Sequence, residues 1–282
     1  MRVMASPAIV APQRTAESPW RAVVTGLDGA VLAPGATITP ATLNAAAQLR
    51  HRGVPLLAAT ARTRHGVLRL DAFARHLAVA VCHNGALGWV PQSGRTLWRR
   101  TLPVGELRDL AAFVRALPGA GLAVFGVRSW DITPEYLALR GRAPAEPWRA
   151  AALGDVTDQP AYGAAIRHGS LGADELIDRL TAAGFAARTS LSWSTPGVVD
   201  VAAPGVDRGA GVARALDWLG VPPGRTVAFG GVPTDLSVFA LVGHSVAVGR
   251  AHPAVLAAAT AHTPEVTADG FARHLAALGL IA

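Results

Sequence analysis

Short apolar runs alternate with amphipathic stretches along the chain, and most apolar runs end in a polar or glycine-containing corner. Runs with the length and β-branched content of buried strands lie at 23–32, 54–59, 77–82 and 226–229. Helical periodicity lies at 40–52, 65–75 and 207–219, and Thr39 and Pro40 have the positions of an N-cap and a first helical residue. Strand followed by helix, repeated, predicts a parallel sheet with right-handed crossovers.

The pattern changes between residues 88 and 194, where short strands alternate with amphipathic helices at 104–117 and 173–183. We interpret this part as an inserted α/β cap that covers the active edge of the sheet. The run at 197–203 then returns toward the first domain. The predicted domains are a disordered leader over 1–20, a core formed by 21–87 and 195–282, and a cap over 88–194.

Composition narrows the functional classes. No apolar run approaches the roughly 18 residues of a membrane span, so the sequence favours a soluble protein without a membrane partner. A single cysteine, Cys82, excludes an intrachain disulfide and fits the cytoplasm. The formal charge is +7, but the arginines are scattered and form no basic block, so we expect no nucleic-acid partner.

Four polar corners carry the candidate chemistry. Listed in order, they are Gly26-Leu27-Asp28-Gly29, Ala59-Thr60-Ala61-Arg62, Gly205-Val206-Asp207-Arg208-Gly209 and Gly230-Gly231-Val232-Pro233-Thr234-Asp235. Two further signatures are His83-Asn84-Gly85-Ala86 and Asp269-Gly270-Phe271-Ala272. The carboxyl ends of parallel strands share one edge, where ligands of open α/β folds bind, so these corners predict one site.

The six stretches together resemble the motifs of the Cof-type branch of the haloacid dehalogenase (HAD) superfamily, sugar-phosphate phosphatases with a large α/β cap. The resemblance implies a Rossmann-like core, a parallel sheet in three α/β/α layers, with an inserted α/β cap. Three of the departures from the family pattern fall on positions with a role in the family's chemistry. Gly26 stands where the family has its nucleophilic aspartate, Arg208 where it has lysine, and Gly231 where it has a metal-binding aspartate.

The resemblance also implies roles for individual residues. In the family an aspartate attacks phosphorus, a second aspartate protonates the leaving oxygen, and Mg²⁺ helps to hold the phosphoryl group. By position, Asp28 and Asp235 are the catalytic candidates; the candidates for ligand or phosphate binding are Thr60, Arg62, Asn84 and Arg208. Glycine can neither attack phosphorus nor bind a metal, so we expect no cofactor and weak or absent Mg²⁺ binding.

The same residues have plainer interpretations. Asp28 precedes a glycine and could cap its own turn, and Thr60 could satisfy backbone groups at a strand end. Arg208 lies in the first turn of a predicted helix, where it could contact an anion or pair with Asp207 or Asp235. Losing two carboxylates together with a divalent ion leaves the net charge of the site unchanged, which fits a metal-free state.

These patterns support several functions. The first is a HAD-like protein without standard phosphatase turnover that binds a small anionic or phosphorylated metabolite between core and cap. The second is an enzyme with metal-free acid and base chemistry at Asp28 or Asp235, for which a buried Asp28 would be the sign. The others are a residual phosphatase and a protein-binding pseudoenzyme, the latter marked by an exposed apolar patch on the cap. The sequence does not indicate an oligomeric state.

Overall fold

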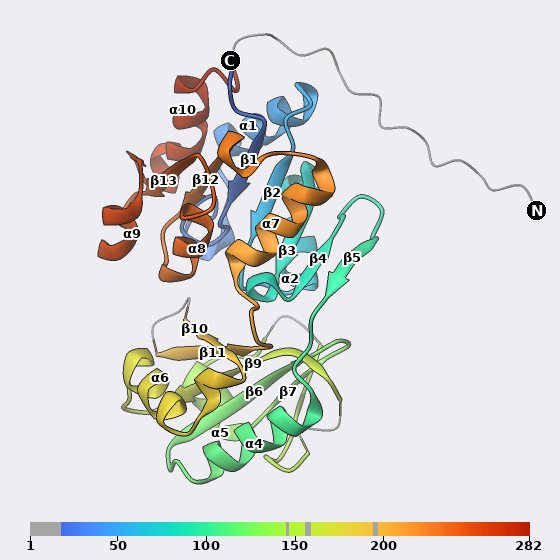
Figure 1. The fold of residues 1–282 in the computed structure, drawn as a ribbon, viewed down its shortest axis with the longest axis vertical. Helices are drawn as coiled ribbons and strands as arrows, with labels where there is room; N and C mark the ends of the chain where they lie inside the picture. The colour runs from blue at the N-terminus through green and yellow to red at the C-terminus, as the bar shows by residue number, and fades with distance from the viewer. Residues whose placement is uncertain (1–17, 145–146, 156–158, 194–196) are drawn as a thin grey trace, which may run out of the picture.

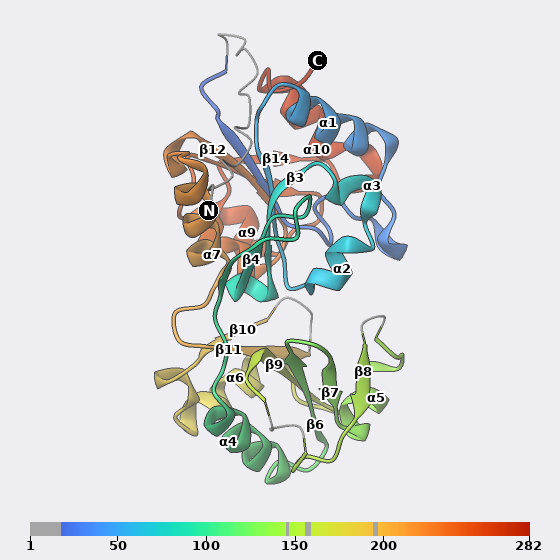
Figure 2. The same cartoon turned by 90° about the vertical axis from the view of Figure 1, so that its right-hand side faces the viewer.

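The computed structural model describes residues 18–282 apart from 145–146, 156–158 and 194–196. Two α/β bodies are joined by two connections, one after β5 and one before α7 (Figures 1 and 2). The core is built on an eight-stranded sheet of order β14-β13-β12-β1-β2-β3-β4-β5. Its strands are β1 (Ala22–Thr25), β2 (Leu56–Ala59), β3 (Leu77–Cys82), β4 (Leu87–Trp89), β5 (Thr96–Arg99), β12 (Thr226–Gly230), β13 (His244–Val248) and β14 (Ala261–Thr263).

The six strands from β14 to β3 are parallel, while β4 and β5 add an antiparallel edge. Buried residues of both sheet faces form two separate apolar clusters. One cluster contains residues of α1 (Pro40–His51), α2 (Arg64–Leu68), α3 (Asp71–Ala74) and α10 (Gly270–Ala277). The other contains residues of α7 (Arg208–Leu219), α8 (Leu236–Phe239) and α9 (Pro253–Ala258). The predicted three-layer α/β/α core is therefore confirmed.

The cap is built on a six-stranded sheet of order β10-β11-β9-β6-β7-β8. Its strands are β6 (Ala120–Gly126), β7 (Trp130–Ile132), β8 (Trp148–Ala150), β9 (Ala161–His168), β10 (Ser190–Ser192) and β11 (Val198–Ala202). Helices α4 (Val104–Arg115) and α6 (Ala173–Ala182) pack against one face, and α5 (Pro134–Arg140) packs with residues of the other face. The cap lies against the end of the core that carries the carboxyl ends of β1 and β2 (Figure 1).

The change from core to cap falls at different residues from those in the sequence interpretation. Strands β4 and β5 lie within the expected cap but pair with the core sheet, and β11 lies within the expected core but pairs with β9 of the cap. An apolar run of three to five residues shows that a strand forms, but its partner depends on contacts distant in sequence. The chain therefore passes from the core sheet to the cap near residues 100–102 and returns to the core near residues 203–204.

Local signals at the helix ends were informative. Thr39 caps α1, since its hydroxyl accepts a hydrogen bond from the backbone N–H of Thr42 at 3.2 Å. The expected helix over 65–75 is instead two short helices, α2 and α3, because the chain leaves helical geometry at Leu70. The expected leader falls mostly on residues 1–17, outside the described residues, while Trp20 packs against the core. Within the described chain, no helix is long and apolar enough to span a membrane.

Candidate functional site

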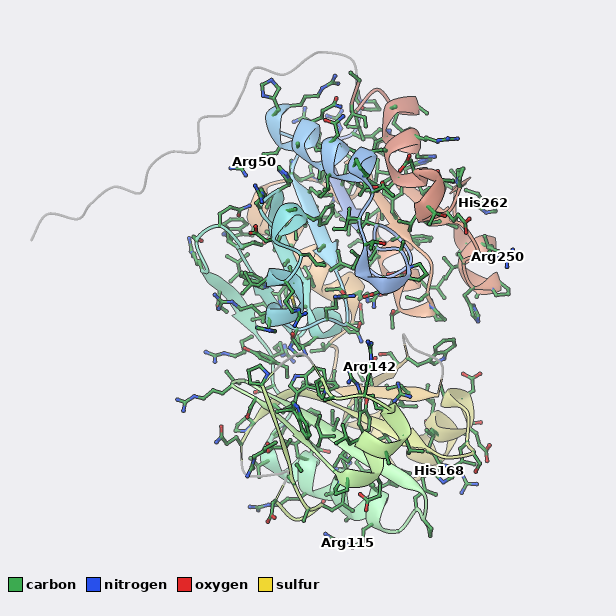
Figure 3. The ribbon with its side chains drawn as sticks, turned by 180° about the vertical axis from the view of Figure 1, so that it is seen from behind. Arg50, Arg115, Arg142, His168, Arg250 and His262 are labelled. Carbon is green, nitrogen blue, oxygen red and sulfur yellow. The ribbon has the colours of Figure 1, made fainter. Side chains whose placement is uncertain are left out.

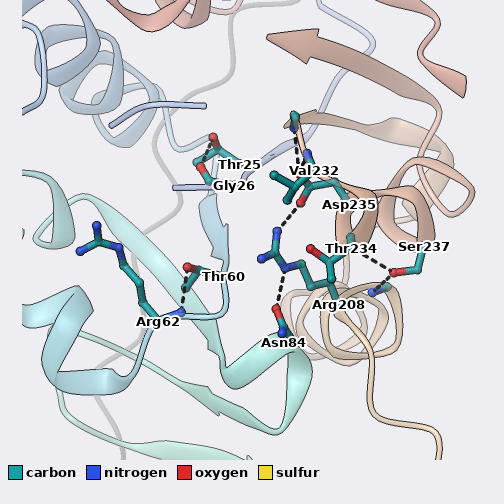
Figure 4. Close-up of polar contacts among 12 residues, drawn as sticks. Thr25, Gly26, Thr60, Arg62, Asn84, Arg208, Val232, Thr234, Asp235 and Ser237 are labelled. Atoms are coloured by element: carbon teal, nitrogen blue, oxygen red, sulfur yellow. Dashed lines mark hydrogen bonds and ion pairs between the residues drawn. The ribbon is translucent and has the colours of Figure 1, made fainter. Parts of the chain in front are cut away.

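Three neighbouring core strands bring the polar corners together. The sheet order places β1 between β12 and β2, and all three are parallel. Gly26 follows β1 and Thr60 follows β2 at the same edge (Figure 4). Gly231 follows β12, the neighbour of β1 on its other side. Helix α7 adds its first residue, Arg208, to this edge. The predicted gathering of the four motifs at one sheet edge is what the fold produces.

Arg208 and Asp235 form a buried ion pair at this edge. Their side chains are each 5% exposed, and Nη1 of Arg208 lies 2.6 Å from Oδ1 of Asp235. The Nε–H of Arg208 donates to Oδ1 of Asn84 at 2.9 Å. Of the two acids that the sequence offered Arg208 as partners, Asp235 is therefore the one with which it pairs. The preceding residue, Asp207, instead caps α7 by accepting from the backbone N–H of Ala210.

Both oxygens of the Asp235 carboxylate are engaged. While Oδ1 accepts from Arg208, Oδ2 accepts from the backbone N–H groups of Gly231 at 2.8 Å and Val232 at 3.1 Å. These contacts close the turn that follows β12 and satisfy a carboxylate that is 4% exposed. A buried carboxylate is costly unless it is paired and hydrogen-bonded. The charge of the Asp235 carboxylate is thus compensated by Arg208 and by two backbone N–H groups.

Asp28 lies at the rim of the site and pairs with Arg62. The guanidinium contacts both carboxylate oxygens, with Nε to Oδ2 at 2.7 Å and Nη2 to Oδ1 at 2.6 Å. The Asp28 side chain is 64% exposed and that of Arg62 is 26% exposed. Such a two-point contact fits the planar fork of arginine. The structure therefore gives each of the two candidate acids an arginine partner.

Thr60 is buried, and its hydroxyl accepts from the backbone N–H of Arg62 at 3.1 Å. This is the plainer of its two roles, satisfying a backbone group just beyond the end of β2. Asn84 follows β3 with a positive φ of 51° and is 7% exposed. Its side chain accepts from Arg208 and donates to Oδ2 of Asp200 in β11 at 3.1 Å. Asn84 thereby connects the core site to the cap.

The sequence interpretation did not single out Asp200. Its one available signal is an acidic residue within the apolar stretch at 197–203, which a fully buried strand does not favour. In the fold, His83 stacks on the cap residue Tyr162 with ring centroids 4.7 Å apart. Burial lowers the pKa of His83 to about 3, so this imidazole is neutral at ordinary pH. These contacts fasten the cap to the core beside the site.

Packing does not require glycine at Gly26 or at Gly231, where the family has aspartates. A Cβ added to Gly26 would lie 3.5 Å from Cβ of Ala30 and 3.7 Å from both carboxylate oxygens of Asp235, which is ordinary van der Waals contact. At Gly231 the nearest atoms would be 3.9 Å away. Neither residue has a positive φ. A Cβ therefore fits at both positions, and Gly26 carries no reactive group where it faces the buried carboxylate.

The hollows around the site differ in size and lining. The space enclosed directly between Asn84, Asp200 and the neighbouring cap strands is about 20 Å³, room for roughly one water molecule. A hollow of about 260 Å³ lies on the core beside Asp28 and Gly231. A third, of about 240 Å³, lies between core and cap on the other side of His83 and Tyr162.

Comparison with known proteins identifies the family. The sequence profile of the haloacid dehalogenase-like hydrolases matches residues 23–275, so the chain belongs to this family. The resemblance inferred from the motifs is therefore confirmed.

Solved structures show the same fold. The fold is similar to that of a sugar phosphatase of HAD subclass IIB, with a TM-score of 0.78 and 18% identity over 93% of this chain and 100% of that one. It is also similar to a HAD-superfamily phosphatase from Bacteroides thetaiotaomicron, with a TM-score of 0.81 and 18% identity over 96% of this chain and 100% of that one. At this identity the likeness establishes the fold.

Two phosphoglycolate phosphatases are similar in sequence over shorter stretches. The protein from Methanothrix thermoacetophila is 36% identical over 80 residues, which cover 27% of this chain and 36% of that protein. The protein from Halorubrum lacusprofundi is 37% identical over 109 residues, which cover 39% of this chain and 48% of that protein. The chain thus spans less than half the length of these curated relatives.

The family resemblance implies Mg²⁺, and the residues present can be tested against that ion. Mg²⁺ requires hard oxygen ligands in near-octahedral geometry, usually with carboxylates among them. Among the described residues, no group of three or more His, Cys, Asp or Glu side chains is placed to hold a metal. The carboxylate of Asp235 is held by Arg208 and two backbone N–H groups, and that of Asp28 by Arg62. This donor set does not fit Mg²⁺.

Proposed function

We propose that this protein binds a small anionic or phosphorylated metabolite between its core and cap without the aspartyl-phosphate turnover of standard HAD phosphatases. The observation that carries the proposal is the buried ion pair between Arg208 and Asp235, with Gly26 facing it. No nucleophilic side chain extends from the position where the family has its attacking aspartate. The site is balanced in charge by its own residues.

Electrostatics support the loss of Mg²⁺ dependence as part of the proposal. The guanidinium of Arg208 already compensates the charge of Asp235 at 2.6 Å, in a place almost closed to water. A divalent ion at the same carboxylate would meet the repulsion of Arg208, and Gly231 supplies no second carboxylate. We therefore expect that Mg²⁺ does not change the properties of the native protein at physiological concentration.

The experiment restores both lost carboxylates. Phosphate release from a panel of sugar phosphates and other phosphomonoesters is measured with and without Mg²⁺ for the native protein and for the Gly26→Asp plus Gly231→Asp double variant. Both positions accommodate a Cβ at ordinary contact distances. We expect an inert native protein and Mg²⁺-dependent release by the double variant, which would show that the two lost carboxylates are what standard turnover lacks.

A matched control is the Gly26→Asn plus Gly231→Asn variant, which adds the same volume without the charge. We expect it to stay inactive, because an amide is a poor nucleophile and a weaker Mg²⁺ ligand than a carboxylate. Mg²⁺-dependent release by the native protein overturns the proposal and returns the chain to the ordinary phosphatases of its family.

The alternative of repurposed acid and base chemistry receives less support. A general acid or base of this kind is expected in a shielded environment that tunes its pKa. Asp28 is instead 64% exposed and is held by both nitrogens of the Arg62 fork. Asp235 is shielded, but both of its oxygens are occupied.

The proposal includes a small-molecule partner and a cytoplasmic setting. The relatives reported above are named as phosphatases of sugar phosphates or phosphoglycolate, which supports a small phosphorylated ligand. The single cysteine, Cys82, is buried and accepts a hydrogen bond from the indole N–H of Trp89 at 3.4 Å, so it has the role of a core residue. A chain with one core thiol fits a reducing compartment.

A further inference from the structure

The sheet edge that carries the four motifs is called the motif edge below. Its two arginines, Arg62 and Arg208, are already neutralised by carboxylates. Arg62 is held by Asp28 through two hydrogen bonds, and Arg208 is held by Asp235. An incoming phosphate would have to displace a carboxylate from one of these arginines before it gained a contact. The space beside Asn84 and Asp200, about 20 Å³, is too small for a metabolite, and the hollow of about 260 Å³ beside Asp28 and Gly231 is lined by two acidic residues, Asp28 and Glu265, with one arginine, Arg250. The anionic group of the proposed metabolite therefore needs another binding site.

A second hollow between core and cap has the required charge. Its volume is about 240 Å³, and it lies beside the stacked rings of His83 and Tyr162. Three arginines line it: Arg64 from α2 and Arg99 from β5 on the core side, and Arg128 from the turn between β6 and β7 on the cap side. Among the described residues that line it there is no aspartate or glutamate.

These three arginines differ from the paired arginines elsewhere in the chain. None of Arg64, Arg99 and Arg128 forms an ion pair within the described part of the chain, whereas Arg149 and Arg188 are held by carboxylates. The guanidinium of Arg64 lies over the ring of the buried Trp89, 4.6 Å from its centre, in a cation–π contact. The hollow thus concentrates three positive charges without an acidic neighbour in its lining.

The hollow lined by Arg64, Arg99 and Arg128, called the arginine hollow below, is separate from the motif edge. None of Gly26, Asp28, Thr60, Arg208 and Asp235 lines it. His83 and Tyr162 line both this hollow and the small space beside Asn84, so their stacked rings lie between the two. A ligand seated here would contact both domains and remain apart from the position of the lost nucleophile.

We propose that the arginine hollow binds a small organic phosphate that carries two or more anionic groups, with Arg64, Arg99 and Arg128 as its anion contacts. This deepens the proposed function and rests on it. Planar guanidinium forks match phosphate oxygens, and one anionic group cannot neutralise three arginines. A volume below the usual range of about 300–1,000 Å³ for drug-sized ligands favours a molecule such as a sugar bisphosphate.

Calorimetric titration tests this site with defined probes. The probes are pyrophosphate and fructose 1,6-bisphosphate, with glycerol phosphate as the singly phosphorylated comparison, each at low and at physiological salt. We expect pyrophosphate and fructose 1,6-bisphosphate, which carry two phosphate groups, to bind more tightly than glycerol phosphate, which carries one. We expect salt to weaken the binding of all three. The Arg99→Gln plus Arg128→Gln variant is expected to weaken binding at least about tenfold, since each lost contact is a charge-assisted hydrogen bond.

The matched control is Arg115→Gln. Arg115 is an exposed arginine at the end of α4, on the far side of the cap from the core (Figure 3). We expect it to leave affinity within about twofold, because it is far from the hollow and its charge is screened. Unfolding curves of all variants verify that each is folded. A control that weakens binding as much as the double variant overturns the site, because net charge alone then accounts for the effect.

Two further outcomes separate this inference from the proposed function. Binding that is lost in Arg62→Gln but kept in Arg99→Gln plus Arg128→Gln overturns the arginine hollow and leaves a metabolite-binding role at the motif edge. A native protein that binds none of the probes at about 10 mM, an affinity near the lower limit of specific recognition, contradicts both.

Discussion

Asn84 of the core donates a hydrogen bond from Nδ2 to Oδ2 of Asp200 in the cap at 3.1 Å, while its own Oδ1 accepts from Arg208. One amide thus connects the buried ion pair of the core with the cap sheet. Asn84 can hold this position because asparagine tolerates a positive φ, here 51°. The Asn84 side chain therefore links the ion pair between Arg208 and Asp235 to the cap strand that contains Asp200.

Removal of the Asn84 amide is expected to destabilise the protein. Asn84→Ala leaves Arg208 without one acceptor, and we expect a loss of about 1–3 kcal/mol in the free energy of unfolding. Asn84→Gly is the companion variant, because it removes the same amide without the backbone strain that alanine meets at positive φ. Denaturant unfolding measures both. A Gly variant as stable as the native protein contradicts the structural role of the amide.

Breaking the buried ion pair is expected to be more severe. Arg208→Met leaves the Asp235 carboxylate buried without its cation, and we expect a loss of about 3–5 kcal/mol. The matched control is Arg179→Met, which breaks an exposed pair with Glu175 on α6 and should cost less than about 1 kcal/mol. Urea unfolding at neutral pH measures the difference. Equal losses for the two variants contradict a buried, charge-balanced site.

Stability is expected to fall in acid through the buried His83 and the partly buried His244 and His274. The pKa of His83 is lowered from 6.5 to about 3 by burial, and burial also lowers the pKa values of His244 and His274. The folded state then binds fewer protons than the unfolded state below about pH 6.5, so stability is complete above that pH and is lost as pH falls toward the folded pKa. Each such histidine contributes at most about 1.4 kcal/mol per pH unit.

The variant that checks this is His83→Asn, because asparagine also tolerates the positive φ of 49° at this position. We expect its unfolding free energy to depend less on pH between about 6.5 and 4 than that of the native protein. His51→Asn, at the exposed end of α1, is the comparison. If the His83 variant keeps the full acid dependence, the acid loss has another origin.

The sequence predicted the features of the fold that depend on local signals. Thr39 and Pro40 marked the start of α1, and the polar corners at Thr60 and Asp235 marked the ends of strands that share an edge. Pairing partners were harder, because β4 and β11 are short apolar runs whose neighbours are set by distant contacts.

The candidate site was predicted as a set of positions, and its internal pairing was open. Sequence placed Arg208 near an acid but could not choose between Asp207 and Asp235, since the choice depends on the approach of two chain segments. At Gly209, next to Arg208, these segments meet, since its backbone N–H donates to Oγ of Ser237 at 3.0 Å. The pair between Asp28 and Arg62 was missed for a similar reason, as the two residues are 34 positions apart.

The most direct test of the account is phosphate release by the native protein in Mg²⁺, compared with the Arg208→Gln variant on the same panel of phosphomonoesters. The account predicts that the native protein releases phosphate no faster than the variant, because Gly26 offers no nucleophile and Arg208 serves to balance Asp235. Mg²⁺-dependent release by the native protein that disappears in Arg208→Gln would contradict it.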